Sequence, residues 1–566
     1  MKKRIFLFAT VAALLTIGCT KDDITTVSDS TSTSSEDDEG DDPVTDVTAT
    51  DTVTVVFSTS GSATVSGTGS YVSASVSGNG VTIVNSGEEV VCYKLSGSTS
   101  DGFFKLYSQT KQIMILNSVS ITNTGGAAIN IQGSQSSPSS GKKTYVVING
   151  SNSLTDGSSY TSTPSTEDEK GCLFSEGKLV LSGSGSLTVT AKGGAGICSD
   201  DYVTVQSNPT LTVSSSAGHG IRGKDMILIE SGTLDISTSA NMKKGMSSDS
   251  LVRFDGGETT IKVTGSAAYD SEDKEYTGTA GVKADVSFVM NNGTLTVTNS
   301  GTGGKGISCD GTGYFNGGTV KVTVTGSNYT QGDISSKGIK CDGNLTFAGS
   351  TVTVNCSKHE GIESKGTITV SGGEVYSYSA SDDAINSAST FTISGGKVCG
   401  YATNNDGLDA NGNFYITGGL VYAIGTSSPE VAIDANTEGG YKLYVQGGTL
   451  IAIGGLENNS SLTQSCYSAS SWSKNTWYAL TTGAGTYAFK TPSSGGTPLV
   501  VSGSGTPTLS SSVTVSSGTE IFEGMMYTGA STSGGTSVSL SSYSGGGGNN
   551  PGGGGGPGGG GGPGGK

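Results

Sequence analysis

The sequence predicts an all-β protein whose body is a right-handed parallel β-helix, a solenoid with three short strands per rung and β caps at both ends. A glycine and an apolar residue recur together with a period of about 24 residues, and only two intervals are much longer. Self-similarity at a fixed period is typical of stacked repeats. The apolar members, which we call the anchor residues, are Leu173, Ile197, Ile221, Met246, Val282, Ile307, Ile339, Ile362, Ile385, Leu408 and Ile433.

The repeat that spans residues 361–378 shows why three strands are expected. Three short alternating segments are separated by glycine turns, and Ile368 and Val370 point to one side while Thr367 and Thr369 point to the other. The repeat is shorter than the roughly 40 residues of a propeller blade. Three strands per repeat therefore favour a parallel β-helix, and its right hand follows from the general rule for parallel crossovers.

The alternation also predicts which side chains face the core. In the last four repeats the predicted core residues are Ile362, Ile368, Val370 and Val375; Ile385, Phe391, Ile393 and Val398; Leu408, Phe414, Ile416 and Val421; and Ile433, Leu443, Val445 and Leu450. The two long intervals contain insertions at residues 267–279 and 328–335.

The N-terminus has the pattern of a lipoprotein signal. Residues 1–19 start with basic side chains, continue with an apolar segment too short to span a bilayer, and end at Cys19. We therefore expect a signal peptide over residues 1–19, lipidation of Cys19 and a surface-exposed lipoprotein that contacts the outer membrane only through its lipid anchor. The alternative is a simply secreted protein that is cleaved nearby.

The rest of the chain divides by composition and by the presence of the repeat. The predicted parts are a disordered acidic tether (20–50), an N-terminal β cap (51–119), the parallel β-helix domain (120–460), a C-terminal β cap (461–543) and a Gly/Pro-rich flexible tail (544–566). Eight cysteines follow Cys19 without zinc-type spacing, and Cys309 and Cys341 are expected as small buried side chains in neighbouring repeats.

Two acidic columns flank the anchor residues of the last repeats. Equivalent positions in neighbouring repeats lie about 4.8 Å apart, and two carboxylates at that distance repel by roughly 3 kcal/mol at an effective dielectric constant of 20. Oxygens from both columns are suitable ligands for a hard cation, and Ca²⁺ is the expected ion. The predicted metal ligands are Glu360, Glu363, Asp383, Asp406, Asp409 and Asp434. The alternative is a solvated acidic face, partly neutralised by Lys358 and Lys365.

A column of tyrosines is predicted on the outside of the same repeats. Tyrosine rings on a flat β face can stack on pyranose rings while their hydroxyl groups form hydrogen bonds. The predicted carbohydrate-binding residues are Tyr376, Tyr378, Tyr401, Tyr415, Tyr422 and Tyr444. The alternative is that these rings pack beneath the C-terminal cap.

Several segments resemble a known family when they are taken in order. They are Leu116–Val119, Ala128–Ile131, Gly171–Gly177, Gly183–Val189, Asp406–Gly412 and Ile416–Gly419. From about Val53 to past Tyr487 the chain is similar to bacterial surface proteins known as carbohydrate-binding domain-containing proteins. The resemblance implies a right-handed parallel β-helix similar to polysaccharide lyases, bound calcium, polysaccharide binding and no assigned catalytic activity.

The middle repeats depart from the pattern of that family. Where the family often places Asp two residues before the anchor, this chain has His219, Lys244, Lys305 and Lys337. Calcium carried over from the resemblance is therefore expected only in the C-terminal repeats.

The sequence as a whole predicts a non-catalytic, calcium-dependent, cell-surface lipoprotein that binds acidic or plant cell-wall polysaccharides. The net charge of −17 argues against nucleic acid as a partner. Three alternatives stay open: a polysaccharide lyase, a glycoside hydrolase that uses Glu360 and Glu363, and a structural adhesin. The candidate lyase bases are Lys337, Lys340, Lys358 and Lys365, whereas His219 and His359 have no triad pattern around them.

Overall fold

The computed structural model describes residues 47–161, 164 and 166–544, and every helix or strand in these ranges is a β-strand. The all-β prediction is confirmed. All of the strands described below belong to one compact unit within residues 48–566. The signal peptide with Cys19, nearly all of the acidic tether and all but one residue of the tail lie outside the described residues. None of the described segments is a helix long and apolar enough to cross a membrane.

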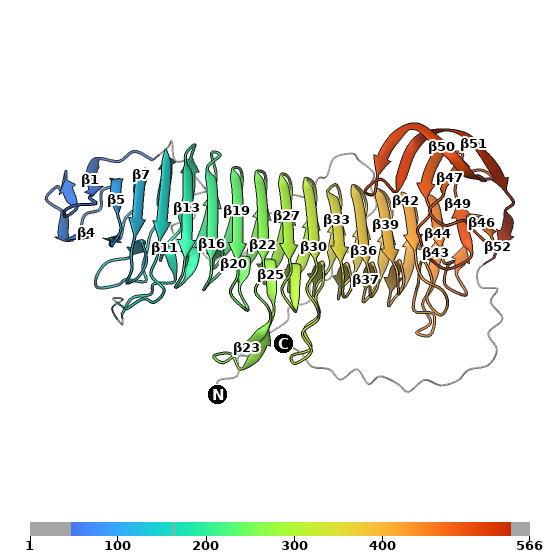
Figure 1. Ribbon diagram of the computed structural model, residues 1–566, viewed down its shortest axis with the longest axis horizontal. Helices are drawn as coiled ribbons and strands as arrows, with labels where there is room; N and C mark the ends of the chain where they lie inside the picture. Colours follow the sequence, from blue (N-terminus) through green and yellow to red (C-terminus); the bar gives the residue numbers. More distant parts are fainter. Residues whose placement is uncertain (1–46, 162–163, 165, 545–566) are drawn as a thin grey trace, which may run out of the picture. The chain divides into compact units, whose positions relative to one another are not determined.

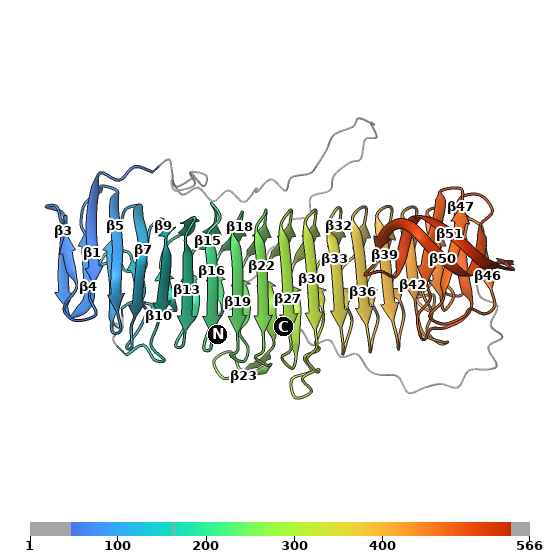
Figure 2. The ribbon, with the colours of Figure 1, turned by 45° about the horizontal axis from the view of Figure 1, so that its top comes forward.

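Most strands belong to three ladders in which parallel neighbours come from successive repeats (Figures 1 and 2). The first ladder contains the anchor residues. Its strands are β4 (Asn79–Asn85), β6 (Gly102–Ser108), β8 (Ile129–Gln132), β11 (Gly171–Ser175), β14 (Ala195–Ser199), β17 (Ile221–Gly223), β20 (Lys244–Ser248), β25 (Thr279–Ala284), β28 (Gly304–Cys309), β31 (Ile339–Cys341), β34 (Ile362–Ser364), β37 (Ile385–Ser387) and β40 (Leu408–Ala410), and β3 (Val72–Ser77) pairs antiparallel with β4.

The second ladder follows the first in each repeat. Its strands are β9 (Thr144–Asn149), β12 (Leu179–Gly183), β15 (Tyr202–Val205), β18 (Met226–Ile229), β21 (Leu251–Phe254), β26 (Ser287–Met290), β29 (Thr312–Phe315), β32 (Leu345–Phe347), β35 (Ile368–Val370), β38 (Phe391–Ile393), β41 (Phe414–Ile416), β43 (Leu443–Val445) and β45 (Ser461–Leu462).

The strands of the third ladder are at least as long as the other strands of their repeat, except in the first repeat. They are β10 (Ser151–Thr155), β13 (Ser186–Ala191), β16 (Thr210–Ser215), β19 (Thr233–Thr238), β22 (Glu258–Val263), β27 (Thr294–Asn299), β30 (Thr319–Val324), β33 (Thr351–Cys356), β36 (Glu374–Ser379), β39 (Lys397–Ala402), β42 (Leu420–Ile424) and β44 (Thr449–Ile453). Upstream, β7 (Gln112–Thr122) pairs with β9, β10 and β5 (Val91–Thr99), and β1 (Asp51–Phe57) pairs with β5 and β2 (Thr64–Ser66).

The core lies between the ladders and is built from the residues that alternate inward. All sixteen predicted core residues of the last four repeats are no more than 1% exposed. The anchors are in register, since Ile362 pairs with Ile385 and Ile385 with Leu408. Cys309 and Cys341 also pair in register, and both are buried free thiols, as predicted. The repeating apolar positions of the sequence therefore form one continuous core.

The glycine that precedes most of the anchors packs too closely against the third ladder to carry a side chain. A Cβ atom on Gly281 would lie 2.2 Å from Cγ1 of Val297 and 2.7 Å from the carbonyl oxygen of Gly306. Gly306 faces Val322 in the same way, with 2.2 Å to its Cγ1. The first ladder thus approaches the third so closely that a side chain at this position does not fit.

The parallel ladders end at a C-terminal region with antiparallel pairing. β49 (Leu499–Ser502) pairs antiparallel with β44 and with β46 (Cys466–Ala469), which in turn pairs with β52 (Ser541–Tyr543). Four strands close a small barrel: β47 (Trp477–Thr482), β48 (Gly485–Lys490), β50 (Thr508–Ile521) and β51 (Met526–Val538). This region covers the last strand of the third ladder, which would otherwise present an open edge.

Candidate functional site

The clearest candidate site is a group of carboxylates beside the last strands of the first ladder, which we call the acidic cluster. Asp406, Asp409 and Asp434 each bring a carboxylate oxygen within 4.8 Å of the others. Asp409 lies in β40, and Asp434 follows Ile433, which forms a parallel bridge with Leu408. The regular stacking of repeats therefore superposes acids that come from successive repeats, as the sequence predicts.

Hydrogen bonds fix the orientation of these carboxylates. The side-chain amide of Asn386 donates to Oδ2 of Asp383 over 2.9 Å and to Oδ2 of Asp409 over 2.7 Å. Oδ1 of Asp383 accepts a hydrogen bond from the backbone N–H of Asp406, and Oδ1 of Asp406 accepts one from the backbone N–H of Val431. The acids are therefore held in place by neighbouring repeats, although Asn386 is itself a donor that blocks two of their oxygens.

The carboxylates of the cluster repel one another when they are ionised, and no basic side chain in the described part of the chain pairs with them. Burial raises the pKa of Asp383 to about 8, and the charge of Asp409 acts in the same direction. Burial also raises the pKa of Asp406 to about 8, and burial together with contact with Glu457 raises the pKa of Asp434. Within the described residues no Lys, Arg or His forms an ion pair with these four aspartates. Such a donor set suits a divalent cation that prefers oxygen ligands.

Glu457 extends the acidic cluster and is missed by the sequence analysis. Ile433 forms a parallel bridge with Leu456, so Glu457 follows its anchor as Asp434 does. The signal was present in the sequence, because Leu456 follows Ile433 by one period and so continues the series of anchors by one repeat.

Two predicted ligands, Glu360 and Glu363, lie in a different charge arrangement. Nζ of Lys337 is 3.2 Å from Oε2 of Glu360 and 2.6 Å from Oε2 of Glu363. Glu360 also contacts the imidazole of His359, which lies 3.0 Å from Asp382. Although burial opposes it, contact with Asp382 and Glu360 raises the pKa of His359 to about 9. These carboxylates have cationic partners within the protein, so they are poorer metal ligands than the acidic cluster.

The contacts of Lys337 with Glu360 and Glu363 also argue against a lyase that uses this lysine as its base. Burial favours the neutral amine of Lys337, but Glu360 and Glu363 outweigh it and raise the pKa of this lysine. A lysine that holds its proton this firmly is a poor general base. Lys340 and Lys365 form ion pairs with Asp342.

The prediction that the tyrosines lie on an open outer face is wrong for Tyr376 and Tyr422. Tyr422 is fully buried and Tyr376 is 8% exposed, because both pack into an apolar cluster with the C-terminal barrel. Tyr378 and Tyr401 are partly buried against the same cluster. These rings do point away from the main core, but the barrel covers the outer face on which they lie. For these residues the structure shows packing beneath the C-terminal cap, which is the alternative to an open binding face.

A conservative substitution of Tyr422 distinguishes packing beneath the barrel from contact with a carbohydrate. The hydroxyl group of Tyr422 donates a hydrogen bond to the backbone carbonyl of Lys490 over 2.8 Å. We expect Tyr422→Phe to lower the free energy of unfolding by about 1 kcal/mol, since the carbonyl of Lys490 loses its donor, and to leave polysaccharide binding unchanged. Urea unfolding and affinity measurements on the same preparation check both. Weaker binding at unchanged stability would contradict the buried role.

The remaining predicted tyrosines, Tyr415 and Tyr444, lie on the second ladder. They occupy paired positions of β41 and β43 and are half-buried. Their rings stack at a centroid distance of 4.8 Å with an interplanar angle of 11°. One face of each ring is therefore covered by the other ring. Carbohydrate binding by this pair stays a prediction.

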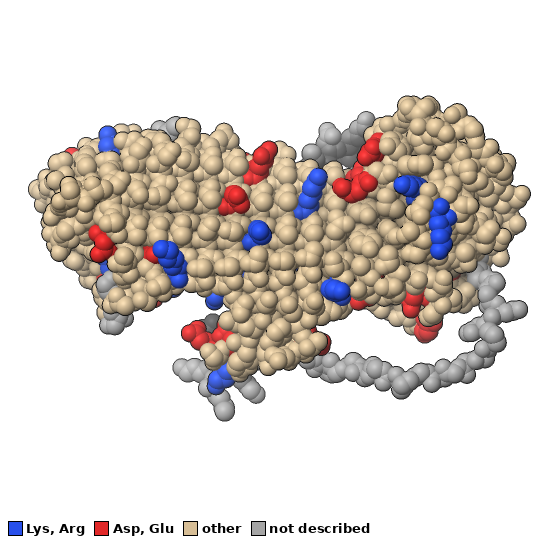
Figure 3. Space-filling model, viewed as in Figure 1, with Lys and Arg blue, Asp and Glu red and all other residues tan. Residues whose placement is uncertain are grey.

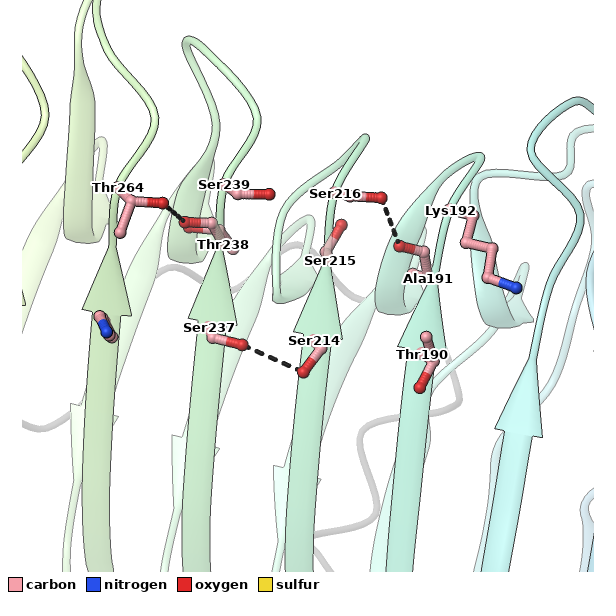
Figure 4. A pocket seen from close by; sticks show the side chains of 11 residues that line it. Thr190, Ala191, Lys192, Ser214, Ser215, Ser216, Ser237, Thr238, Ser239 and Thr264 are labelled. Carbon is pink, nitrogen blue, oxygen red and sulfur yellow. Dashed lines mark hydrogen bonds between the residues drawn. The ribbon is translucent and has the colours of Figure 1, made fainter.

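A groove of about 400 Å³ lies at the ends of four neighbouring strands of the third ladder (Figure 4). Its lining repeats from strand to strand and consists of Thr190, Ala191, Lys192, Ser214, Ser215, Ser216, Ser237, Thr238, Ser239, Lys262 and Thr264. Thr190 pairs with Ser214, Ser214 with Ser237, and Ser237 with Lys262. Charged side chains are sparse on the viewed face (Figure 3). The groove is therefore a row of hydroxyl groups with one lysine toward each end.

Comparison with known proteins identifies the family. A family model described as carbohydrate-binding domain-containing protein matches residues 77–250, 237–332 and 301–384, together more than half of the chain. The chain belongs to this family. The resemblance seen in the sequence is confirmed, and it supports a carbohydrate as the partner.

Among solved structures, the chain is similar to a polysaccharide lyase-like protein from C. thermocellum in its gadolinium derivative, with 21% identity and a TM-score of 0.37. That similarity covers 46% of this chain and 96% of the other. No curated protein matches the chain. The groove lies within the residues matched by the family model, whereas Asp406, Asp409 and Asp434 lie beyond residue 384.

Proposed function

We propose that this protein binds polysaccharide at the bacterial cell surface without catalysing a reaction, and that the groove holds part of the glycan. The observation that carries the proposal is the repeated row of hydroxyl groups along the groove, inside the family-matched residues. Parallel strands lie about 4.8 Å apart, so a linear polymer laid across them meets a hydroxyl group at each strand. Lys192 and Lys262 supply charge-assisted donors, which favours acidic or plant cell-wall glycans.

We infer that the three ladders are the three faces of one right-handed parallel β-helix with three strands per rung. The pairing of strands from successive repeats supports the solenoid, and the hand follows from the general preference of parallel crossovers. Such a body offers flat outer faces on which the same side-chain position recurs at a constant distance.

We also propose that the acidic cluster holds Ca²⁺. Asp383, Asp406, Asp409 and Asp434 would supply the oxygen ligands, and Glu457 lies next in the column. A bound cation would neutralise carboxylates that have no cationic partner among the described residues, and it would tie neighbouring repeats together. The fit rests on the chemistry of the donors: all are carboxylates, which is the ligand type of hard cations.

The place of the protein in the cell is part of the proposal. Anchoring of Cys19 to lipid and exposure on the outer membrane rest on the pattern of residues 1–19 alone. Labelling with radioactive palmitate, with Cys19→Ala as the control, tests the anchor.

A glycan array tests the binding function. The full chain is applied in calcium and in chelator, alongside Ser214→Trp, which fills the groove, and Ser75→Trp, an exposed control on β3. We expect a polysaccharide signal that falls at least about tenfold in Ser214→Trp, because a bulky ring excludes the glycan from the hydroxyl row, and that stays unchanged in the control. A wild type that binds no glycan under either condition would overturn the proposal. Release of product from a polyuronate would favour the lyase instead.

A further inference from the structure

Three tyrosines come together on the two insertions that interrupt the repeat. β23 (Ala268–Asp270) and β24 (Glu275–Thr277) form a hairpin in which Tyr269 and Tyr276 are directly opposed. Their ring centroids are 5.2 Å apart with an interplanar angle of 67°, and Tyr329 from the second insertion lies 5.8 Å from Tyr276. Tyr269 is 51% and Tyr276 41% exposed, so much of each ring faces solvent. We call Tyr269, Tyr276 and Tyr329 the tyrosine platform.

The hairpin that carries the platform begins close to one end of the groove. Thr264, at one end of the groove lining, comes shortly before Ala268, where the hairpin begins. Hydrogen bonds to neighbouring repeats hold the residues between Thr264 and Ala268 in place. The N–H of Ala267 donates to the carbonyl of Thr302 over 2.7 Å, and the N–H of Met242 donates to the carbonyl of Ser266. Both ribbon views show the hairpin protruding from the row of strands (Figures 1 and 2). A chain that leaves the groove past Thr264 therefore meets the hairpin.

The second insertion is packed firmly enough to hold the rings in place. Tyr329 and Ile334 exchange backbone hydrogen bonds of 2.8 and 3.0 Å. The side chain of Asn328 accepts from the N–H of Ser336 and donates to the carbonyl of Lys358. A Cβ atom on Gly332 would lie 2.4 Å from Cβ of Tyr276, so the two insertions are in close contact. Binding to rings already held in this way costs little conformational entropy.

The charges around the platform indicate what kind of sugar it accepts. The hairpin carries Asp270, Glu272, Asp273 and Glu275 against the single cation Lys274. Figure 3 shows acidic atoms gathered on the protruding hairpin. A uronate or sulfated sugar would be repelled here, whereas the carboxylates are good acceptors for the hydroxyl groups of a neutral sugar.

We propose that the tyrosine platform is a stacking site for an uncharged pyranose unit of the polysaccharide that lies in the groove. The apolar face of the sugar ring packs on the exposed face of one of the two rings, Tyr269 or Tyr276, while the other ring, inclined at 67°, contacts the edge of the sugar. The hydroxyl groups of the sugar bond to the acidic rim. This inference rests on the proposed polysaccharide-binding function and adds to it a second contact with its own selectivity. Cross-strand aromatic pairs also stabilise short hairpins, but that role alone does not require half-exposed rings.

Isothermal titration with cellohexaose, xylohexaose and hexagalacturonate tests the proposal on the full chain. The variants are Tyr269→Ala with Tyr276→Ala, and Tyr441→Ala as a control at another tyrosine that is 44% exposed. We expect the double variant to bind the best neutral hexasaccharide about five- to tenfold more weakly, the range of a lost aromatic contact. The control is expected to bind like the wild type, and hexagalacturonate to be insensitive to the double variant.

Nitration of tyrosine by tetranitromethane gives a second readout on the unmodified protein, which does not depend on folding of a variant. Saturating neutral hexasaccharide is expected to protect Tyr269 and Tyr276 from nitration and to leave Tyr441 reactive. A wild type that binds these sugars with no protection and no loss in the double variant overturns the platform alone. A loss confined to hexagalacturonate overturns its preference for neutral sugar. A wild type that binds no saccharide overturns the proposed function, and this inference falls with it.

Discussion

Replacing Gly281 by valine is expected to lower the free energy of unfolding by about 3 kcal/mol or more, at the upper end of what overpacking a core costs. The new Cβ would lie 2.2 Å from Cγ1 of Val297 and 2.7 Å from the carbonyl of Gly306. Relief by backbone movement is blocked, because Gly281 lies in β25 between the neighbouring strands β20 and β28. The substitution must therefore separate the first and third ladders locally.

The chain itself contains a matched control for this prediction. In most repeats the third-ladder residue sixteen positions after the glycine is β-branched, as Val297 is for Gly281. One repeat has Ala384 in place of the glycine, and there the residue sixteen positions later is Gly400. The side chains at these two positions therefore occupy the same space between the first and third ladders. Gly281→Ala should be destabilising by itself, and adding Val297→Gly should recover part of the loss by recreating the Ala384–Gly400 pair.

Urea unfolding followed by far-ultraviolet circular dichroism measures these effects on the full chain. Because repeat proteins can unfold in stages, we compare the midpoint of the earliest transition. A Gly281→Val midpoint equal to that of the wild type would contradict the packing argument. A double variant less stable than Gly281→Ala would show that the two positions do not share volume.

The period of the sequence was sufficient to predict the all-β class and the core. A repeat of about 24 residues with three alternating segments places Ile362, Ile368 and Val375 inward, and all three are fully buried. This works because alternation along a strand and register between repeats are local rules. The same rules superposed Asp409 and Asp434, and one further repeat would have added Glu457.

The error over the tyrosines has a physical cause. Alternation correctly separates residues that face the core from those that face away, but it does not say what covers the outer face. Tyr376 and Tyr422 face away from the core and are nevertheless buried by the C-terminal barrel. One of the contacts that hold the barrel there, from the N–H of Phe522 to Glu374, joins residues 148 positions apart. No periodic signal links such distant segments.

Residues that lie outside the repeat were overlooked for a different reason. Tyr269, Tyr276 and Tyr329 lie in insertions, which interrupt the period and so appear only as exceptions to it. Lys337 was seen as a departure from the acidic column, but its contact with Glu360 and Glu363 depends on side-chain direction. Repetition therefore predicts the scaffold and the acidic column, whereas it does not predict contacts made by the insertions or by single departures such as Lys337.

Calcium is expected to stabilise the protein strongly above pH 7 and only weakly at pH 5. In the metal-free protein the pKa values of Asp383 and Asp406 are raised to about 8 by burial, far above those of unfolded aspartate. Between about pH 4 and pH 8 the folded state therefore holds more protons than the unfolded state, so stability falls as the pH rises. Ca²⁺ replaces those protons, and at a hundred times its Kd it adds about 2.7 kcal/mol.

Thermal unfolding between pH 5 and pH 8, in calcium and in chelator, measures this dependence. The unfolding temperature in chelator should decline with rising pH, and calcium should restore it mainly at the alkaline end. Asp406→Asn with Asp409→Asn should remove the calcium response and flatten the decline, since two of the titrating ligands are gone. Asp342→Asn is the matched control, because Lys340 and Lys365 already neutralise that carboxylate, and contact with them outweighs burial and lowers its pKa.

The pH profile distinguishes a metal site from a solvated acidic face. Freely solvated carboxylates titrate near pH 4 in both states, so stability would then be nearly constant from pH 5 to pH 8. A chelator curve that is flat over this range, or a calcium response that survives in the double variant, would remove the acidic cluster from the metal site. A declining chelator curve without any calcium response would instead show buried, protonated carboxylates that serve the packing of the last repeats.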